Sequence, residues 1–267
     1  MITRFAPAPT GYLHLGHVVS ALAVWGEAER AGAAGNAAEV LLRIEDHDRG
    51  RSRLEYERAI LEDLAWLGFE PDRTVPRQSD RGDDYLRALH ALRGQGLVYV
   101  CECSRSDLDA PEVPGGERRY PGTCAHKNLA DGPGRSLRVR LEPSVERFVD
   151  RRLGPQEQQP SAQCGDLLLR DRNGNWTYQF CAVVDDCNEA ISLVVRGEDL
   201  LASTGRQILL ARLLGRREPP EFLHHALVMK APGSKLSKSD GDTGVRELRA
   251  KGWTAADVIR HARSLIS

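Results

Sequence analysis

The sequence has almost no net charge: 37 Lys and Arg residues are balanced by 38 Asp and Glu residues, which leaves a formal charge of -1. This balance excludes a chain-wide basic surface for nucleic acid, so any RNA-binding surface must be local. The chain also lacks an apolar run near the ~18 residues of a membrane span, and its first residues have no secretion-signal pattern. We therefore expect a cytoplasmic protein without membrane contact.

Cysteine is scarce, with six residues in 267. Without a secretion signal, these cysteines indicate thiols or metal ligands rather than a disulfide framework. Three of them cluster in a loop-like segment, at Cys101, Cys103 and Cys124. Thiolates are good zinc ligands, and Tyr120 and His126 are both open as the fourth ligand of a closed site. The other three are scattered and are expected in the core or without a role: Cys164, Cys181 and Cys187.

Apolar periodicity predicts strands and helices that alternate along the chain. Strands are expected at residues 2–5 and 40–44 with a helix between them, and a Ser52–Glu55 capping box predicts a second helix that ends at Gly68. Such a pattern favours an α/β fold, a doubly wound parallel sheet whose ligands bind at the carboxyl ends of the strands. Further helices are expected at 85–92, 203–214 and from Thr254, and further strands at 137–141, 166–170 and 191–195.

The stretch RFAPAPTGYLHLGH (residues 4–17) forms the first strand-to-helix turn of this arrangement. Its glycines let the backbone approach a ligand, and amides at a helix N-terminus favour an anion. His14 and His17 can donate hydrogen bonds to phosphate oxygens as charge builds up in a transition state. The alternative is that both histidines are ordinary turn and cap residues.

A second motif, KLSKS (residues 235–239), lies in a segment rich in Gly and Ser. Its two lysines suit a polyphosphate, because they act as movable point charges while small neighbours leave room. Alone, this motif is equally well explained by a solvated basic loop. HLGH and KLSKS in this order on an α/β background are similar to the paired signatures of class I aminoacyl-tRNA synthetases.

Four further motifs resemble the glutamyl branch of that class: RFAPAPTG, RIEDHDR, TYQFCAVVDD and VVRGEDLL. The resemblance implies a Rossmann-like sheet of the class I type with an inserted zinc-binding subdomain. It implies four segments: 1–96, the first half of the catalytic domain; 97–165, an inserted zinc-binding, acceptor-like subdomain; 166–240, the second half with the KLSKS loop; and 241–267, a short helical segment.

Only residues 240–267 follow the KLSKS motif, too few for the anticodon-binding region of glutamyl-tRNA synthetases. The resemblance therefore narrows to the glutamyl-Q tRNA(Asp) synthetase family. It implies activation of L-glutamate by ATP without tRNA, followed by transfer to the queuosine base at the wobble position of tRNA(Asp). His17 departs from that family, which often has a small polar residue there. Two alternatives stay open: a compact glutamyl-tRNA synthetase that charges a tRNA 3′ end, and a non-catalytic zinc-stapled paralogue that binds RNA or a nucleotide.

The resemblance also implies the site residues. Two arginines can each fork onto a carboxylate of glutamate, while Glu45 pairs with its ammonium group. The alternative for Glu45 and Asp46 is a strand-end salt-bridge pair. The expected glutamate ligands are Arg4, Phe5, Ala6, Pro7, Ala8, Glu45, Tyr178 and Arg196; the ATP ligands are His14, Gly16, His17, Lys235, Leu236, Ser237, Lys238 and Ser239, of which His14, His17, Lys235 and Lys238 are catalytic.

The implied cofactors and partners follow from the same resemblance. One structural Zn²⁺ is expected on Cys101, Cys103, Tyr120 and Cys124, and ATP is expected as a substrate with Mg²⁺. The other partners are L-glutamate and queuosine-bearing tRNA(Asp), bound by a monomer. Candidate RNA contacts are the C-terminal helix and a set of arginines that could equally form a solvated face: Arg118, Arg119, Arg135, Arg151 and Arg152.

Overall fold

The structure is a computed structural model that describes residues 1–104, 107, 119–230, 234–235 and 244–266. The chain forms two compact units. The first unit contains Met1–Asp80, Ile191–Glu198 and Phe222–Ser267, and the second contains Arg81–Ala190 and Asp199–Glu221. The four segments expected from the sequence stay a prediction.

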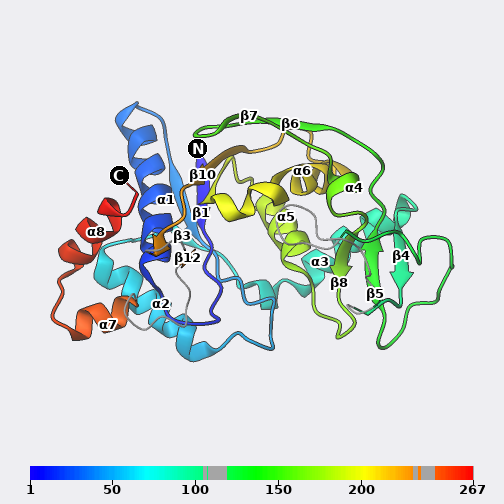
Figure 1. Ribbon diagram of the computed structural model, residues 1–267, viewed down its shortest axis with the longest axis horizontal. Coiled ribbons are helices and arrows are strands. Elements are labelled where there is room, and N and C mark those ends of the chain that lie inside the picture. Colours follow the sequence, from blue (N-terminus) through cyan, green and yellow to red (C-terminus); the bar gives the residue numbers. More distant parts are fainter. Residues whose placement is uncertain (105–106, 108–118, 231–233, 236–243, 267) are drawn as a thin grey trace. The chain divides into compact units, whose positions relative to one another are not determined.

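A parallel sheet organises the first unit (Figure 1). Its strands β1 (Ile2–Phe5), β2 (Glu39–Leu42) and β3 (Arg73–Thr74) pair in this order, and both pairs are parallel. The connections carry α1 (Leu15–Ala33) and α2 (Leu54–Leu67), as parallel strands require a crossover. The expected α/β fold with a parallel sheet is confirmed.

Two more strands lie on the other side of β1. The amide of Ser192, just before β9 (Leu193–Gly197), donates to the carbonyl of Ile2 at 2.9 Å. The strand β10 (Glu221–His225) is the neighbour of β9. After β10 come the short hairpin of β11 (Met229–Lys230) and β12 (Ser234–Lys235), then α7 (Val245–Ala250) and α8 (Ala255–Ser264).

The core of the first unit is formed by α1, the sheet and the C-terminal helices. Val18 and Val19 of α1 are fully buried, and so are Val258 and Ala262 of α8, which packs against α1. The expected N-cap of α8 is confirmed: the Thr254 hydroxyl accepts from the Asp257 amide, and the Asp257 carboxylate accepts from the Thr254 amide. A capped amphipathic helix thus closes this core.

The predicted start of α2 was wrong. The helix begins at Leu54 with Arg53 as N-cap, and no side chain caps it. The hydroxyl of Ser52 is buried and has no hydrogen-bond partner among the described residues. The predicted end is confirmed, because Gly68 has a left-handed conformation with φ 81° that glycine adopts without strain.

The second unit contains an antiparallel sheet, in the order β4 (Val98–Cys101), β5 (Ser136–Val139), β8 (Leu167–Arg170). Its core also buries parts of α3 (Gly82–Gly94), α5 (Tyr178–Asn188) and α6 (Thr204–Leu213). The remaining elements are short: the hairpin β6 (Glu146–Asp150) and β7 (Gly154–Gln158), the helix α4 (Pro160–Gln163), and the 3-10 turns η1 (Gln78–Asp80) in the first unit and η2 (Glu198–Ser203).

Among the described residues, no helix combines the length and the apolar character that crossing a bilayer requires.

Candidate active site

The HLGH turn is held by both of its histidines. His14 is the N-cap of α1, and its Nδ1 accepts from the amide of Gly16 at 3.1 Å. The Nδ1 of His17 accepts from the amide of His14 at 3.1 Å, so the two imidazoles form a reciprocal capping box. The structure thus supports the alternative interpretation, in which both histidines act as turn and cap residues.

This capping fixes the tautomer of each ring. A ring nitrogen that accepts from a backbone amide carries no proton, so Nε2 bears the N–H of each neutral imidazole. Capping and donation to a phosphate oxygen hence use different nitrogens, and one does not exclude the other. Gly16 is required here, because a Cβ at this position would lie 2.9 Å from Cε1 of His14.

The described residues on either side of residues 236–243 contact the first unit. Lys235 is the last residue of β12 and pairs with Met229 across the hairpin. Leu236, Ser237, Lys238 and Ser239 lie outside the described residues. Farther along, Gly244 forms a backbone bridge with His14, and the Val245 amide donates to the carbonyl of Leu13 at 2.9 Å. The segment that contains Lys238 therefore ends against the HLGH turn.

The predicted glutamate-binding stretch, residues 4–8, continues the pairing of β1 with β2. The Arg43 amide donates to the Phe5 carbonyl and the Glu45 amide to the Pro7 carbonyl, both at 3.0 Å. Pro7 and Glu45 are thereby brought together just beyond the paired strands. Arg4 is buried, and its guanidinium donates to the carbonyl of Val195 in β9 at 3.4 Å.

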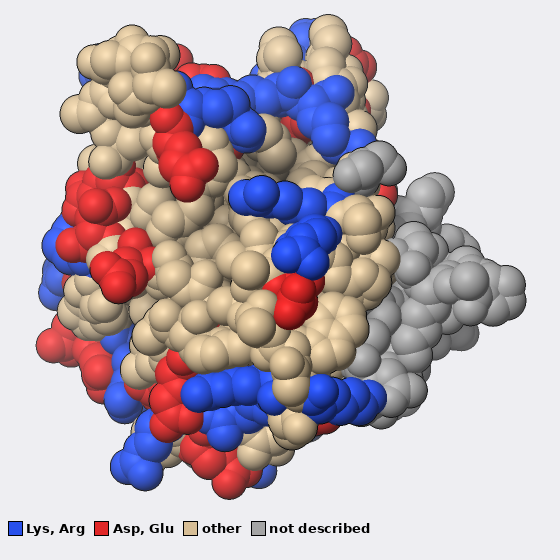
Figure 2. All heavy atoms as spheres, turned by 90° about the vertical axis from the view of Figure 1, so that its left-hand side faces the viewer, with Lys and Arg blue, Asp and Glu red and all other residues tan. Residues whose placement is uncertain are grey.

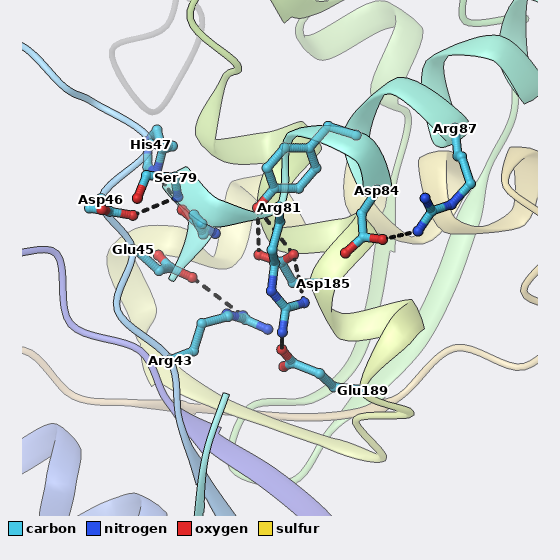
Figure 3. Close-up of polar contacts among 12 residues, drawn as sticks. Arg43, Glu45, Asp46, His47, Ser79, Arg81, Asp84, Arg87, Asp185 and Glu189 are labelled. Carbon is cyan, nitrogen blue, oxygen red and sulfur yellow. Dashed lines mark hydrogen bonds and ion pairs between the residues drawn. The ribbon is translucent and has the colours of Figure 1, made fainter. Parts of the chain in front are cut away.

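Glu45 already has a cationic neighbour. The guanidinium of Arg43 is fully buried and donates to the Glu45 carboxylate at 3.3 Å (Figure 3). The carboxylate of Asp46 points elsewhere and accepts from the Ser79 amide at 2.8 Å. The alternative interpretation, a strand-end salt bridge, therefore applies to Glu45 with Arg43 as its partner, and Arg43 is a functional candidate that sequence reasoning missed.

Arg196 lies on β9, and its Nε donates to Nε2 of His224 at 3.0 Å. Both residues are buried, His224 completely. The Phe222 ring, on the same strand as His224, faces the guanidinium at 5.7 Å. Sequence reasoning missed His224; its signal was an imidazole inside the apolar strand run FLHH (residues 222–225), where an uncompensated polar group is costly.

The structure thus brings part of the predicted pocket together. Arg4, Glu45 and Arg196 lie on or directly after the neighbouring strands β1, β2 and β9 of the first unit. Tyr178 is a half-buried residue at the start of α5 in the second unit.

The three clustered cysteines converge in the second unit. Their sulfur atoms all lie within 4.8 Å of one another, and Cys103 and Cys124 are 3.5 Å apart. Zinc–sulfur bonds of about 2.3 Å in a tetrahedral site place sulfur atoms about 3.8 Å apart, so the set fits this metal. The Tyr120 hydroxyl lies 3.4 Å from the Cys101 sulfur, whereas His126 is exposed and outside the cluster.

The thiols of this cluster differ in acidity. Burial and the hydrogen bond that the Cys103 thiol donates to Cys124 raise the pKa of Cys103 to about 11. Burial opposes ionisation of Cys124 too, but hydrogen bonds from the Glu102 backbone and the Tyr120 hydroxyl lower its pKa. Cys124 therefore offers a thiolate to a metal ion more readily than Cys103 does.

The arginines expected to grip RNA are scattered, and several already have protein partners. Arg119 donates to the Ser161 carbonyl, Arg135 to the Ala130 carbonyl, and Arg151 forms an ion pair with Glu221. Arg118 lies outside the described residues. On the face shown in Figure 2, Lys and Arg side chains form separate bands with acidic and uncharged atoms between them, so this face has no continuous basic surface. The RNA contacts stay a prediction.

Comparison with known proteins places these features in a family. Residues 1–262 match the model of class I tRNA synthetases (E and Q), catalytic domain. The glutamyl-Q tRNA(Asp) synthetase of Bordetella bronchiseptica is 44% identical over 246 residues, which cover 90% of this chain and 75% of that protein. The protein of the same name from Rhodobacter capsulatus is 38% identical, and the match covers 97% of this chain and 99% of that one.

A solved structure extends the likeness to three dimensions. A glutamate tRNA ligase from Elizabethkingia meningosepticum, in complex with its amino acid, matches with a TM-score of 0.75 and 30% identity. The match covers 91% of this chain and 52% of that one, so this chain spans about half the length of the ligase. The motifs, the parallel sheet and these relatives agree: the chain belongs to the glutamyl-Q tRNA(Asp) synthetase family of class I tRNA synthetases.

Proposed function

We propose that this protein activates L-glutamate with ATP in the absence of tRNA and transfers it to the queuosine base at the wobble position of tRNA(Asp). One observation carries the proposal: the match to the glutamyl-Q tRNA(Asp) synthetase of Rhodobacter capsulatus covers nearly the whole of both chains. The geometry of the first unit supports it, because buried arginines and a carboxylate lie on neighbouring strands near the HLGH turn. A monomer in the cytoplasm stays a prediction.

In this proposal glutamate binds at the carboxyl ends of β1, β2 and β9. The guanidinium groups of Arg4 and Arg196 bind its two carboxylates, and Glu45 accepts from its ammonium group. The Arg43–Glu45 pair orients the Glu45 carboxylate. The residues Phe5, Ala6, Pro7 and Ala8 line the site with their backbone. The role of Tyr178 as a glutamate ligand stays a prediction.

ATP, as its Mg²⁺ complex, binds with its phosphates between the N-terminus of α1 and the KLSKS segment. A carboxylate oxygen of glutamate attacks the α-phosphorus, the bond to the bridging oxygen breaks, and pyrophosphate leaves. His14 and His17, through Nε2, together with Lys235 and Lys238 stabilise the charge on the phosphoryl oxygens. Gly16 leaves room for the His14 ring, and Leu236, Ser237 and Ser239 complete the ATP site.

The second step starts from glutamyl-adenylate, which is a mixed anhydride of glutamate and AMP. A hydroxyl group of the queuosine ring attacks the carbonyl carbon of glutamyl-adenylate, an ester forms, AMP leaves, and the hydroxyl proton is released. Zinc would be held by Cys101, Cys103, Cys124 and Tyr120, and its contribution is structural, because four protein ligands close the site and order the surrounding loop.

The test of activation is exchange of radiolabelled pyrophosphate into ATP with glutamate and no tRNA. We expect exchange with glutamate and none with glutamine or aspartate. A protein that binds ATP or RNA but shows no exchange would be a non-catalytic paralogue, and the proposal would be wrong.

The test of transfer uses tRNA(Asp) with and without queuosine. Labelled glutamate is expected only on the queuosine-bearing RNA, and the labelling should persist when the 3′ terminal adenosine is removed from the RNA before the reaction. Equal charging of the queuosine-free RNA would instead identify a compact glutamyl-tRNA synthetase.

A further inference from the structure

We infer that Arg138 is a positioning residue of the zinc site, which holds the ring of Tyr120 so that its hydroxyl serves as the fourth metal ligand. The inference rests on the proposed function, in which Tyr120 joins three cysteines around zinc. The guanidinium of Arg138 lies over this ring, with its Cζ atom 3.7 Å from the ring centroid. At this distance a cation and the face of an aromatic ring attract each other and are in van der Waals contact.

The pairing of β4 with β5 brings Arg138 to the cysteine cluster. In this antiparallel pair Tyr99 lies opposite Arg138, and Cys101 lies opposite Ser136. Residues that are opposite each other, or two apart on one strand, point to the same face of a sheet. Cys101 and Arg138 therefore share one face of the sheet, and both are buried, Arg138 with 8% of its surface exposed.

The backbone of Tyr120 is fixed by a close approach to Gly165. The Tyr120 amide donates to the Cys164 carbonyl at 2.9 Å, and Tyr120 forms a backbone bridge with Gly165. A Cβ at residue 165 would lie 1.9 Å from the Tyr120 carbonyl oxygen, so only glycine fits there. These backbone contacts do not orient the ring. The ring is held by Arg138 on one face and by the Cys124 amide, which donates to its hydroxyl at 2.9 Å.

A cation beside the ring also suits the charge of a zinc complex. Three thiolates outweigh the charge of Zn²⁺, and a tyrosine oxygen adds further electron density. Arg138 donates to the neutral carbonyl of Asp166 at 2.8 Å, and its buried Nε has no hydrogen-bond partner among the described residues. A buried guanidinium is stabilised by nearby negative charge, which the thiolates of a loaded site would supply.

The experiment measures the zinc affinity of the full-length protein by competition with a chromophoric chelator. Arg138→Met should bind zinc about 10–100-fold more weakly, the factor typical of residues that orient a metal ligand. Arg138→Lys keeps the positive charge and a donor for the Asp166 carbonyl, but its ammonium group does not stack on a ring as a planar guanidinium does. Its zinc affinity should therefore fall between those of wild type and Arg138→Met.

A double-mutant cycle shows whether Arg138 acts through Tyr120. Tyr120→Phe keeps the ring and removes the ligand oxygen, so it should weaken zinc binding by itself. In the Tyr120→Phe background, Arg138→Met should change the zinc affinity by no more than about twofold, because the ligand that Arg138 orients is already lost. A residue that only stabilised the fold would cost the same factor in both backgrounds.

Arg140→Met is the matched control. Arg140 lies two residues after Arg138, and its guanidinium donates to the carbonyl of Ala125 at 2.9 Å. It thus contacts the loop of the cluster, but the ring that it approaches is Tyr99, at 5.9 Å. We expect a comparable loss of thermal stability, and any change in zinc affinity should be the same with and without Tyr120→Phe.

The outcomes separate the possible failures. If wild-type protein does not bind zinc, the proposed zinc site is wrong, and if Tyr120→Phe binds zinc as tightly as wild type, Tyr120 is not a ligand; either result overturns the inference as well. If Tyr120→Phe weakens binding but Arg138→Met costs the same factor in both backgrounds, the zinc site stands and the role of Arg138 is refuted. Wild-type zinc affinity of Arg138→Met or Arg138→Lys would refute it too.

Discussion

Two buried arginines of this protein have opposite surroundings. Arg196 in the first unit contacts an imidazole and a phenyl ring, both uncharged. Arg81 in the second unit donates to two acidic side chains, Asp185 at 3.1 Å and Glu189 (Figure 3). The described contacts of Arg81 thus include two carboxylates, whereas those of Arg196 include two aromatic rings on β10.

The difference teaches which arginine is available to a ligand. A guanidinium that is compensated by two carboxylates gains little from a third anion, and its removal leaves those carboxylates buried and unpaired. A guanidinium oriented by neutral groups retains its attraction for an anion. We therefore expect Arg81 to determine stability and Arg196 to determine substrate affinity.

Replacement of Arg81 should have the largest effect on stability. In the Arg81→Met variant, Asp185 and Glu189 lose their cationic partner, which should lower the free energy of unfolding by about 3–5 kcal/mol. Urea denaturation measures this loss. The folded fraction should have a wild-type glutamate KM, and a second change, Glu189→Gln, should recover part of the stability. An unchanged unfolding midpoint would show that the cluster does not depend on Arg81.

Arg196→Leu should impair glutamate binding more than folding stability. Loss of a buried charged partner of the ligand should cost about 2–5 kcal/mol of glutamate binding. The loss of folding stability should be smaller than for Arg81→Met, because Arg81→Met removes a guanidinium that pairs with two buried carboxylates. Pyrophosphate exchange and urea denaturation on the same preparation measure both quantities. A variant with normal glutamate KM and poor stability would remove the distinction between the two arginines.

The sequence predicted those parts of the fold and of the candidate site whose determinants are local. The periodicity around Val18 predicted α1, Gly68 predicted the end of α2, and Thr254 predicted the start of α8; all three are confirmed. The cysteine spacing predicted the cluster of thiols that the structure brings together. Each of these signals lies within a few residues of the feature that it specifies.

The features that were missed depend on contacts between distant segments. The hairpin of β6 and β7 has no apolar alternation, because its buried positions include Glu146 and Asp150 while Val149 is exposed. The charge of buried Glu146 is compensated by an ion pair with Arg212, which lies far from it in the sequence. The contact between Arg196 and His224 is likewise visible only when β10 lies next to β9. No local pattern contains such pairings.

A third arginine tests the same comparison through pH. Arg246 on α7 pairs with exposed Glu62 and lies 3.6 Å from fully buried Asp63. Burial raises the pKa of Asp63 to about 6, against the opposing effect of Arg246. The buried charge of Asp63 is incompletely compensated, since neither of its carboxylate oxygens has a hydrogen-bond partner within the described part of the chain.

The free energy of unfolding therefore depends on pH through Asp63. Above pH 6 the Asp63 carboxyl is ionised in both states, and the wild-type protein bears the full penalty, about 3 kcal/mol for a shift of this size. As the pH falls from 6 to 4 the folded state takes up a proton and the penalty disappears. Asp63→Asn should therefore be more stable than wild type at pH 8, and this advantage should shrink towards pH 4. Urea denaturation across this range measures it, and a constant difference would contradict the assignment.

Replacement of Tyr85 should have the smallest effect on stability, and it tests the cluster of Arg81, Asp185 and Glu189 most directly. Its buried hydroxyl donates to both carboxylate oxygens of Asp185 at 3.1 Å, and burial raises its pKa so that it stays protonated. Tyr85→Phe should lower the free energy of unfolding by about 1.5 kcal/mol. In the Arg81→Met background the loss should be larger, because Asp185 then loses two hydrogen-bond donors, Arg81 and Tyr85. Tyr99→Phe is the matched control: its hydroxyl donates to Asp166 at 2.6 Å, so its cost should be similar and independent of Arg81. Equal costs of Tyr85→Phe in both backgrounds would mean that the carboxylate does not couple the two residues.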